Sequence, residues 1–295
     1  MKILFISFLQ AVHLHALYDK IRYFFRLFRH LREKLSRILF KSVYRHIDDL
    51  ENRNKTLLDI MEYRFGEANN DRIRKKVIYT CISGNYDNLR NHPYIAFDYD
   101  YVCFTDNNEL LEQKNYGVWK IKPMKANFFN NSKNNRWHKI HPHILFSEYN
   151  SSIYIDANIE IKTSHLFDIL EKSSDIRIAQ HPYRNCIYQE IKAVLHYKRD
   201  TEESIKALFE FLKSEQFPKE YGLCENSIIF REHNNSKIIE IMNLWWHMLE
   251  NYSARDQLSL SYVLWKHDID PKNILFPATS TDKINYRYYP HNKKK

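Results

Sequence analysis

A carboxylate and a carboxamide follow one of the most apolar segments of the chain. The stretch "SSIYIDANIEI" (151–161) reads as a buried strand that ends in Asp156, Ala157 and Asn158 before the apolar pattern resumes. Oxygen donors at positions i and i+2 can chelate a hard divalent cation such as Mg²⁺ or Mn²⁺. The alternative is a turn, because Asp and Asn often end strands by bonding to nearby backbone groups. The tripeptide alone does not decide between the two.

Length and composition limit the classes of protein to consider. The chain has 295 residues, of which 44% are hydrophobic and 15% aromatic, enough for one large domain with an appendage or for two modest domains. With only 4 glycines, it has no Gly-rich phosphate loop of the GxGxxG or GxxxxGK[ST] kind. The four cysteines form no CxxC pair, which argues against a zinc knuckle and indicates reduced thiols in a cytosolic compartment. They are Cys81, Cys103, Cys186 and Cys224.

The positive charge is concentrated at the N-terminus. Residues 1–45 hold ten Lys or Arg and two acidic residues, which accounts for eight of the nine net charges. The remainder is nearly neutral, so the sequence does not favour a nucleic-acid partner. Within residues 21–41, apolar side chains recur at helical spacing and the basic ones lie mostly on the opposite face. Such a helix suits an anionic membrane surface, and packing or homo-oligomerisation is the alternative.

Three further observations define the ends of the predicted domains. The first sixteen residues resemble a signal peptide only faintly, because the charged region is a single lysine and Gln10 interrupts the apolar run. A second helix is predicted over about 43–65, and "GEANNDRIRKK" (66–76) reads as a polar linker. We therefore expect a basic helical extension over 1–70 and a separate domain over 76–295.

From residue 77 the pattern alternates between strands and helices. Strands are predicted over 76–82, 101–106, 117–122, 152–158, 176–181 and 226–232. Helices are predicted over 164–172, 188–197, 202–214, 236–250 and 255–267. This alternation predicts an α/β fold with a mixed, mainly parallel sheet flanked by helices.

Polar side chains follow several of the predicted strands. In parallel sheets, ligands bind beyond the carboxyl ends of the strands, where such residues meet. The polar residues at these ends are Asn85, Tyr86 and Asp87 after the first strand, Thr105 and Asp106 after the second, and Asp156 and Asn158 after the fourth. The sequence therefore predicts a ligand site at this edge of the sheet.

Six stretches, in a fixed order over residues 77–265, carry a resemblance to a known family. They are "YTCISGNYDNL" (79–89), "YVCFTDN" (101–107), "RWHKIHPHILFSEYNSSIYIDANI" (136–159), "HPYRNCIYQE" (181–190), "GLCENSIIFREHN" (222–234) and "WWHMLENYSARDQLSLSYV" (245–263). The chain resembles a glycosyltransferase-like family long filed as a domain of unknown function. That family includes plant Golgi proteins of cell-wall and mucilage synthesis and proteins of bacterial surface-polysaccharide loci. The predicted N-terminal helices fall outside the matching stretches.

The resemblance implies a GT-A-like, Rossmann-type fold and glycosyl transfer from a nucleotide sugar. In such enzymes a D-x-D motif holds Mn²⁺ or Mg²⁺, and the ion stabilises the leaving diphosphate as a Lewis acid. This chain has Asn158 where a full D-x-D has a second aspartate, which puts metal dependence in question. His291, late in the chain, is the expected third ligand beside Asp156 and Asn158.

The resemblance also suggests residues for the donor. Gly84 permits a tight turn, and Tyr86 and Asp87 are expected to hold the base and ribose. Thr105 and Asp106 are expected to contact the nucleoside from the second strand. The basic side chains Arg136 and Lys139 are expected to bind phosphate oxygens directly. Asp156 is expected to hold the phosphates through its metal ion. The alternatives are an ordinary turn at "GNYD" and a solvated basic face on the helix.

Acceptor and catalytic residues are expected further along the chain. His181, Arg184, Glu225 and Gln257 are the candidates for contact with the acceptor or the transferred sugar. Asp256 follows Ser253, which has the character of a helix N-cap. It is expected to deprotonate the acceptor hydroxyl in an inverting reaction, and the alternative is a helix-start residue stabilised by the helix dipole.

The sequence therefore predicts a hexosyltransferase-like enzyme that glycosylates a surface glycan of the capsule or lipopolysaccharide type. The acceptor is a glycan or a lipid-linked glycan. The expected location is the cytoplasm, with peripheral attachment to the inner membrane. The alternative of a different class is a non-catalytic nucleotide-sugar-binding or scaffold subunit of a polysaccharide assembly complex. A glycoside hydrolase acting through Asp156 and Asp256 is disfavoured, because hydrolysis does not need polar residues at several strand ends.

Overall fold

The computed structural model describes residues 41–69, 75–170 and 175–292. The chain divides into two compact units, Met1–Asp71 and Arg72–Lys295, which are considered separately here. The basic amphipathic helix predicted within residues 21–41 falls almost entirely outside the described residues.

The described part of the first unit is one helix, α2 (Lys41–Asn69). It confirms the helix predicted over 43–65, but it continues through four residues that we had assigned to the linker. A single glycine, Gly66, is tolerated in a helix at a cost of about 1 kcal/mol, and no proline follows to stop it. No helix in the described ranges is both long enough and apolar enough to cross a membrane.

The second unit is built on an eight-stranded sheet in the order β3-β4-β2-β1-β5-β8-β7-β9. Its strands are β1 (Lys76–Ile82), β2 (Tyr99–Thr105), β3 (Asn115–Tyr116), β4 (Trp119–Pro123), β5 (Ser151–Ile155), β7 (Ile176–Gln180), β8 (Cys224–Arg231) and β9 (Leu275–Phe276). A separate two-stranded sheet joins β6 (Ile159–Ile161) to β10 (Tyr286–Tyr288) in antiparallel pairing. The predicted strand at 152–158 thus ends before Asp156, which leaves Asp156 and Asn158 in the connection between two sheets.

The strand directions bring distant parts of the chain to one edge of the large sheet. β1, β2, β4 and β5 run parallel to one another, which confirms the mainly parallel α/β prediction. β8 runs antiparallel to β5, with Ile155 opposite Ile228 and Ser152 opposite Arg231. The amino end of β8 therefore lies beside the carboxyl end of β5.

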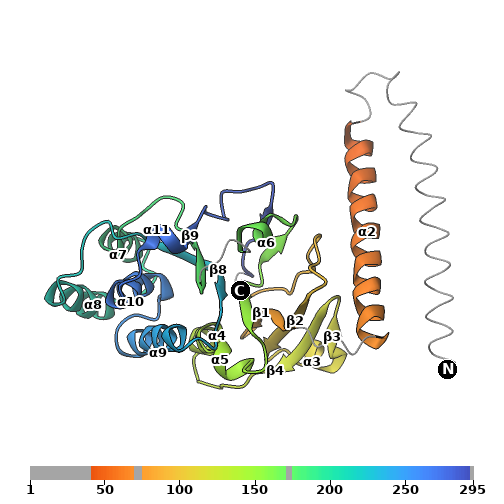
Figure 1. Ribbon diagram of the computed structural model, residues 1–295. Helices are drawn as coiled ribbons and strands as arrows, with labels where there is room; N and C mark the ends of the chain where they lie inside the picture. Colours follow the sequence, from red (N-terminus) through yellow and green to blue (C-terminus); the bar gives the residue numbers. More distant parts are fainter. Residues whose placement is uncertain (1–40, 70–74, 171–174, 293–295) are drawn as a thin grey trace. The chain divides into compact units, whose positions relative to one another are not determined.

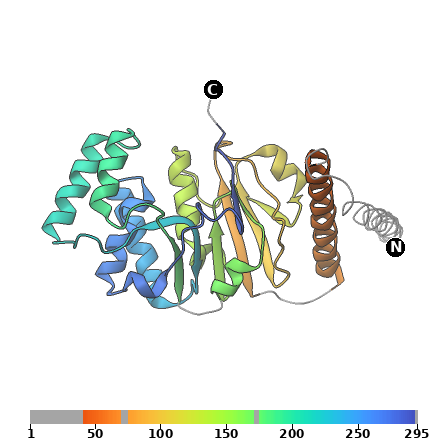
Figure 2. The ribbon, with the colours of Figure 1, turned by 90° about the horizontal axis from the view of Figure 1, so that it is seen from above.

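Helices connect the strands and gather mainly at one end of the sheet. They are α3 (Asn108–Gln113), α4 (Asn131–Ile140), α5 (Pro142–Leu145), α6 (His165–Leu170), α7 (Ile187–His196), α8 (Glu202–Ser214), α9 (Ser236–Asn251), the 3-10 turn η1 (Asp256–Leu258), α10 (Leu260–Lys266) and α11 (Pro271–Ile274). Figure 1 shows α7–α11 beyond the β8-β7-β9 end, away from β2, β3 and β4. Figure 2 shows the same separation from above, with the blue and blue-green helices at one end.

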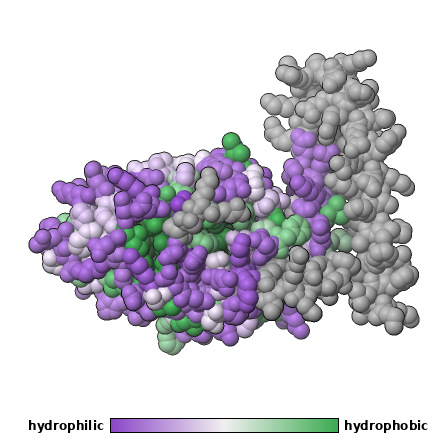
Figure 3. Space-filling model, in the orientation of Figure 1, coloured by the Kyte–Doolittle hydropathy of each residue, from purple (hydrophilic) through white to green (hydrophobic). Residues whose placement is uncertain are grey.

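The central strands are buried on both faces, as their near-continuous apolar sequences require. Every residue of β2 and β5 is buried, and all but the first residue of β1. One core joins these strands to α4, α7, α8, α9 and α10. On the face shown in Figure 3, hydrophilic side chains cover most of the described surface of this unit.

The asparagine-rich segment before α4 fixes where that helix begins. Asn130 caps it by accepting a hydrogen bond from the backbone N–H of Lys133 at 3.1 Å. Buried Asn134 accepts from the N–H of Phe128 at 2.5 Å and donates to the carbonyl of the same residue at 3.0 Å. His138, also buried, accepts from the N–H of Lys125 at 2.9 Å. These bonds hold α4 in place beneath the predicted site, and they give His138 a structural role.

The adjacent tryptophans of α9 test this packing. We expect Trp245→Ala to lower the free energy of unfolding by about 3–5 kcal/mol, because the indole is fully buried and its loss leaves a cavity. Trp246→Ala is the control, since Trp246 only packs against the core from outside and should cost much less. Urea unfolding followed by near-ultraviolet circular dichroism measures both. Equal losses would contradict the assignment of Trp245 to the core.

Candidate functional site

A cleft of about 850 Å³ opens at the edge of the sheet where β1 and β5 end. Its walls come from the loop after β1, from α4, from the connection after β5, from the start of β8, from η1 and from the C-terminal segment. These six segments span more than two hundred residues of sequence. The topology of the sheet is what brings them together.

One face of α4 forms a wall of the cleft. Asn131, Asn135 and Lys139 recur every four residues and therefore lie above one another, with Arg136 beside them. Asn135 donates a hydrogen bond to the carbonyl of Cys81 at the end of β1, at 2.6 Å. The guanidinium of Arg136 donates to the Asn135 amide oxygen at 2.7 Å. The helix is thus joined to the sheet by the same side chains that line the cleft.

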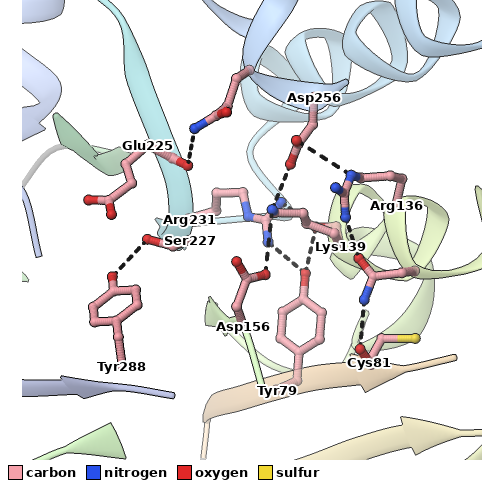
Figure 4. A network of polar contacts seen from close by, with 12 residues as sticks. Tyr79, Cys81, Arg136, Lys139, Asp156, Glu225, Ser227, Arg231, Asp256 and Tyr288 are labelled. Atoms are coloured by element: carbon pink, nitrogen blue, oxygen red, sulfur yellow. Dashed lines mark hydrogen bonds and ion pairs between the residues drawn. The ribbon is translucent and has the colours of Figure 1, made fainter. Parts of the chain in front are cut away.

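A cluster of opposite charges occupies the floor of the cleft (Figure 4). The Lys139 ammonium lies 2.7 Å from Oδ2 of Asp256 and 3.7 Å from Oδ1 of Asp156. Nε of Arg136 lies 3.4 Å from the other Asp256 oxygen. The side chains of Lys139 and Asp256 are 2% and 5% exposed, whereas that of Asp156 is 31% exposed. Asp156 is therefore the carboxylate of this cluster that a ligand can reach.

The environment of Asp256 argues against the general base predicted from the sequence. Burial raises the pKa of this carboxyl, but Arg136 and Lys139 outweigh burial and hold its pKa well below the ordinary range. A base of such low pKa has little affinity for a proton at neutral pH. Asp256 is placed instead to hold the two cations.

The predicted N-cap near Asp256 is wrong in its geometry. The segment 255–267 is not one helix but η1 followed by α10, and Arg255 stands at the cap position of η1. The Ser253 hydroxyl accepts a hydrogen bond from the N–H of Arg255 at 3.1 Å and donates to Asp200 at 2.5 Å. This serine therefore shapes the loop before η1 and does not cap a helix.

A fully buried arginine supports Lys139 from below, and sequence analysis missed it. Arg231 of β8 donates to the carbonyl of Lys139 at 2.8 Å and to the Tyr79 hydroxyl at 2.6 Å. The Tyr79 hydroxyl donates to the same carbonyl at 2.8 Å. A basic residue closing the apolar strand "SIIF" was the available signal, because a charged side chain next to a core strand is rarely buried without a partner.

The glycine turn after β1 forms the rim of the cleft. Gly84 has φ +63°, and a Cβ there would come within 2.0 Å of the Asn131 side chain. Its N–H donates to both carboxylate oxygens of Asp106, at 2.9 and 3.0 Å. Asp106 thus holds the turn. It is not among the residues that line the cleft, nor is buried Thr105, whose hydroxyl accepts from the N–H of Asn107.

The C-terminal segment closes over this rim. His291 lies with its ring centroid 4.6 Å from that of Tyr86, and its Nδ1 pairs with Asp87 at 2.8 Å. The hydrogen bond that His291 donates to Asp87 raises the pKa of the imidazole despite partial burial. The N–H of Asn292 donates to the carbonyl of Tyr86 at 3.1 Å. Tyr86, Asp87 and His291 therefore form one group at the cleft.

The start of β8 brings a further carboxyl group, that of Glu225, to the cleft. Oε2 of Glu225 accepts from the N–H and the hydroxyl of Thr279, at 3.1 and 3.3 Å. Burial raises the pKa of Glu225, and these hydrogen bonds offset only part of the increase. The Gln257 side chain donates to the Glu225 carbonyl at 3.0 Å. The nearby hydroxyls of Ser227, Thr279 and Tyr288 were not found by sequence analysis.

Most of the predicted residues meet in this cleft, and four do not. The predicted residues that line it are Gly84, Tyr86, Asp87, Arg136, Lys139, Asp156, Asn158, Glu225, Asp256, Gln257 and His291. Those that do not are Thr105, Asp106, His181 and Arg184. His181 and Arg184 instead surround buried Glu190, with Nε of Arg184 at 2.5 Å from its carboxylate. This pairing anchors the loop after β7.

The three predicted metal ligands all line the cleft, and each contacts another residue. Asn158 donates from its amide nitrogen to the Tyr289 carbonyl at 2.8 Å, and His291 pairs through Nδ1 with Asp87, so these two contacts use neither the amide oxygen nor the Nε2 that would bind a cation. Asp156 faces the Lys139 ammonium. Within the ranges that the structure describes, no group of three or more His, Cys, Asp or Glu side chains is arranged to hold a metal ion. Of the three predicted ligands only Asp156 brings a negative charge to bind Mn²⁺ or Mg²⁺, and the Lys139 ammonium already faces that carboxylate.

Comparison with protein families identifies the domain that carries this cleft. The family model for the TOD1/MUCI70 glycosyltransferase-like domain matches residues 53–289, which is more than half of the chain. The chain belongs to the TOD1/MUCI70 family. The match starts inside α2 and runs through β10, ending two residues before His291, so the resemblance drawn from residues 77–265 was correct in family but too short at both ends. Membership supports a glycosyltransferase role.

Two solved structures show distant similarity to this TOD1/MUCI70 protein. The apo structure of the WbbM bifunctional glycosyltransferase matches 71% of this chain and 39% of its own, with 12% identity and a TM-score of 0.40. The apo form of mouse xyloside xylosyltransferase 1 matches 68% of this chain and 83% of its own, with 10% identity and the same TM-score of 0.40. The chain thus spans well under half of the WbbM chain. No curated protein matches the sequence significantly.

The ion pair beneath the cleft gives a stability test. We expect Asp256→Asn to lower the free energy of unfolding by about 3–5 kcal/mol at neutral pH, because it leaves the buried Lys139 ammonium unpaired. Asp156→Asn is the control and should cost about 1 kcal/mol or less, since that carboxylate is more exposed and more distant. Chemical unfolding at pH 7 measures both. Equal stability of the Asp256 variant and the parent would contradict the pairing.

The same pair predicts a dependence on pH. Because the pKa of Asp256 is lower in the folded than in the unfolded protein, its contribution is complete above about pH 4, the unfolded value. It is lost as the pH falls below that value toward the folded pKa. Unfolding measured from pH 7 down to pH 3 should therefore show a smaller decline in the Asn variant than in the parent.

Proposed function

We propose that this protein transfers a sugar from a nucleotide-sugar donor to a glycan acceptor. The observation that carries the proposal is the cleft itself, in which a glycine turn, two basic side chains of α4 and a reachable carboxylate converge beyond the ends of parallel strands. Sites of this kind bind phosphorylated ligands in α/β proteins. The family to which the chain belongs supports the same reaction.

The donor fits the β1 side of the cleft. Tyr86 supplies a half-exposed aromatic ring, and Asp87 beside it supplies a carboxylate able to accept hydrogen bonds from ribose hydroxyls. Arg136 and Lys139 on α4 offer charge-assisted hydrogen bonds to the diphosphate. The sugar would then lie between the diphosphate and the start of β8. From the family resemblance, we propose that the donor carries a hexose. On the same ground, we propose that the acceptor is a glycan of the capsule or lipopolysaccharide type.

Glu225 is the base that this geometry favours for the acceptor hydroxyl. Its carboxyl lines the cleft, and burial raises its pKa toward the working pH, which suits a general base. Asp256 has the opposite properties, because it is ion-paired and its pKa is depressed. We therefore transfer the predicted role of base from Asp256 to Glu225, and assign to Asp256 the positioning of Lys139.

The donor assignment is tested by release of nucleoside diphosphate. We expect purified protein to hydrolyse one member of a panel of UDP-, GDP- and ADP-sugars slowly without acceptor, as chromatography of the nucleotide would show. Gly84→Ala should abolish this, because the added Cβ would displace the turn at the cleft. Gly222→Ala is the control, a glycine of equally restricted backbone (φ +111°) that lies against Pro271 outside the cleft. Release by neither parent nor control would contradict the proposed activity.

The base is tested by removing its carboxylate. We expect Glu225→Gln to lower kcat at least ~10²-fold with nearly unchanged KM for the donor, because a carboxamide cannot accept the proton. In the parent enzyme, activity should fall as the pH drops through the raised pKa of Glu225, at a higher pH than for an ordinary glutamate. Glu232→Gln, on the exposed residue just past the far end of β8, is the control. A kcat unaffected by Glu225→Gln would exclude this base.

A further inference from the structure

Lys139 lies where a metal ion would be expected to lie. A divalent cation bound to Asp156 would sit about 2.0–2.6 Å from a carboxylate oxygen. The Lys139 ammonium already faces Oδ1 of Asp156 at 3.7 Å and is almost completely buried, so it cannot swing into solvent to make room. It is held from above by Asp256 and below by the backbone contacts of Arg231 and Tyr79, as Figure 4 shows.

The charges around Lys139 favour an anion in the cleft. Arg255 also lines the cleft. Its positive charge, like those of Arg136 and Lys139, lowers the pKa of Asp256. Within this cluster three cations are thus set against two carboxylates, Asp156 and Asp256. The other two carboxyl groups that line the cleft have partners of their own, since Asp87 pairs with His291 and Glu225 accepts from Thr279. Nε of Arg255 is buried with no hydrogen-bond partner among the described residues. The surplus of positive charge around Lys139 suits a bound anion and disfavours a divalent cation at the same place.

We propose that Lys139, together with Arg136 and Arg255, replaces the divalent cation in this enzyme, so that the donor diphosphate is bound and released without metal. This inference rests on the proposed function. In the reaction, the acceptor oxygen forms a bond to the anomeric carbon, and its proton passes to the Glu225 carboxylate. The bond from the anomeric carbon to the β-phosphate oxygen breaks, and that oxygen keeps the electron pair. The three cations neutralise the charge that develops there.

The network beneath Lys139 explains how a lysine can take this role. A flexible ammonium on a four-carbon stem would normally lose entropy when it is fixed on a phosphate. Here the Lys139 side chain is already packed, with its nitrogen 4.8 Å from the centre of the Tyr154 ring. Asp256 holds its ammonium in an ion pair, and its carbonyl is fixed by two donors. The positive charge is therefore pre-positioned, as a metal ion held by D-x-D would be.

Calorimetric titration with UDP, GDP, ADP and CDP, in EDTA or in Mn²⁺, tests the inference. We expect at least one of them to bind equally well in both, within about threefold. Arg136→Gln and Arg255→Gln should each weaken this binding about 10–100-fold, the value of one charge-assisted hydrogen bond. Lys133→Gln is the control, because Lys133 lies on the same helix but pairs with Glu250 outside the cleft. The arginine variants avoid the loss of folding that replacement of Lys139 would risk.

Two results would overturn the inference in different ways. If a nucleotide binds only with Mn²⁺, and Asp156→Asn abolishes that binding while Arg136→Gln and Arg255→Gln do not, a metal ion takes the role given to Lys139 and the proposed function stands. If no nucleoside diphosphate binds in either condition, the proposed function fails, and this inference with it. Paramagnetic resonance of Mn²⁺ gives a second reading: the signal of free Mn²⁺ should persist when protein and the bound nucleotide are both present.

Discussion

The ion pair between Lys139 and Asp256 is the constraint on which the rest of the site depends. An unpaired ammonium or carboxylate at this depth would be strongly destabilising, so each requires the other. Asp256 stands at the start of η1 and Lys139 near the end of α4, elements separated by 117 residues. Holding the pair together therefore fixes α4 against η1. Residues of both elements line the cleft, so this salt bridge sets how closely those two parts of its lining approach each other.

The sheet meets this constraint through the reversed direction of β8. Because β8 runs antiparallel to β5, its first residues reach the ligand edge while its last residue, Arg231, lies deep under α4. One strand thus supplies Glu225 to the cleft and a buried guanidinium to the carbonyl of Lys139. In an all-parallel sheet the strand after β5 would bring only its carboxyl end to this edge. The reversed direction of β8 therefore connects the cleft to the buried arginine that supports Lys139.

Local sequence patterns predicted much of this fold, since apolar runs and helical periodicity are read over neighbouring residues. The strands β1, β7 and β8 and the helices α7, α8 and α9 were predicted close to their observed bounds. The strand ends likewise indicated Tyr86, Asp87 and Asp156. Roles that depend on a distant partner could not be read in this way. Asp256 was predicted to be a base because its neighbours resemble a helix start, and only the fold reveals two cations beside it.

The contacts of Asn158 explain why a carboxamide follows Asp156 and Ala157. Its backbone carbonyl accepts from the N–H of Tyr289 at 2.9 Å, and its amide nitrogen donates to the Tyr289 carbonyl at 2.8 Å. An aspartate could not make the second bond, because a carboxylate has no donor to offer. The amide therefore ties the turn after β5 to the segment that carries Tyr288 and His291 across the cleft. The carboxamide at position 158 is therefore explained by its hold on the C-terminal segment.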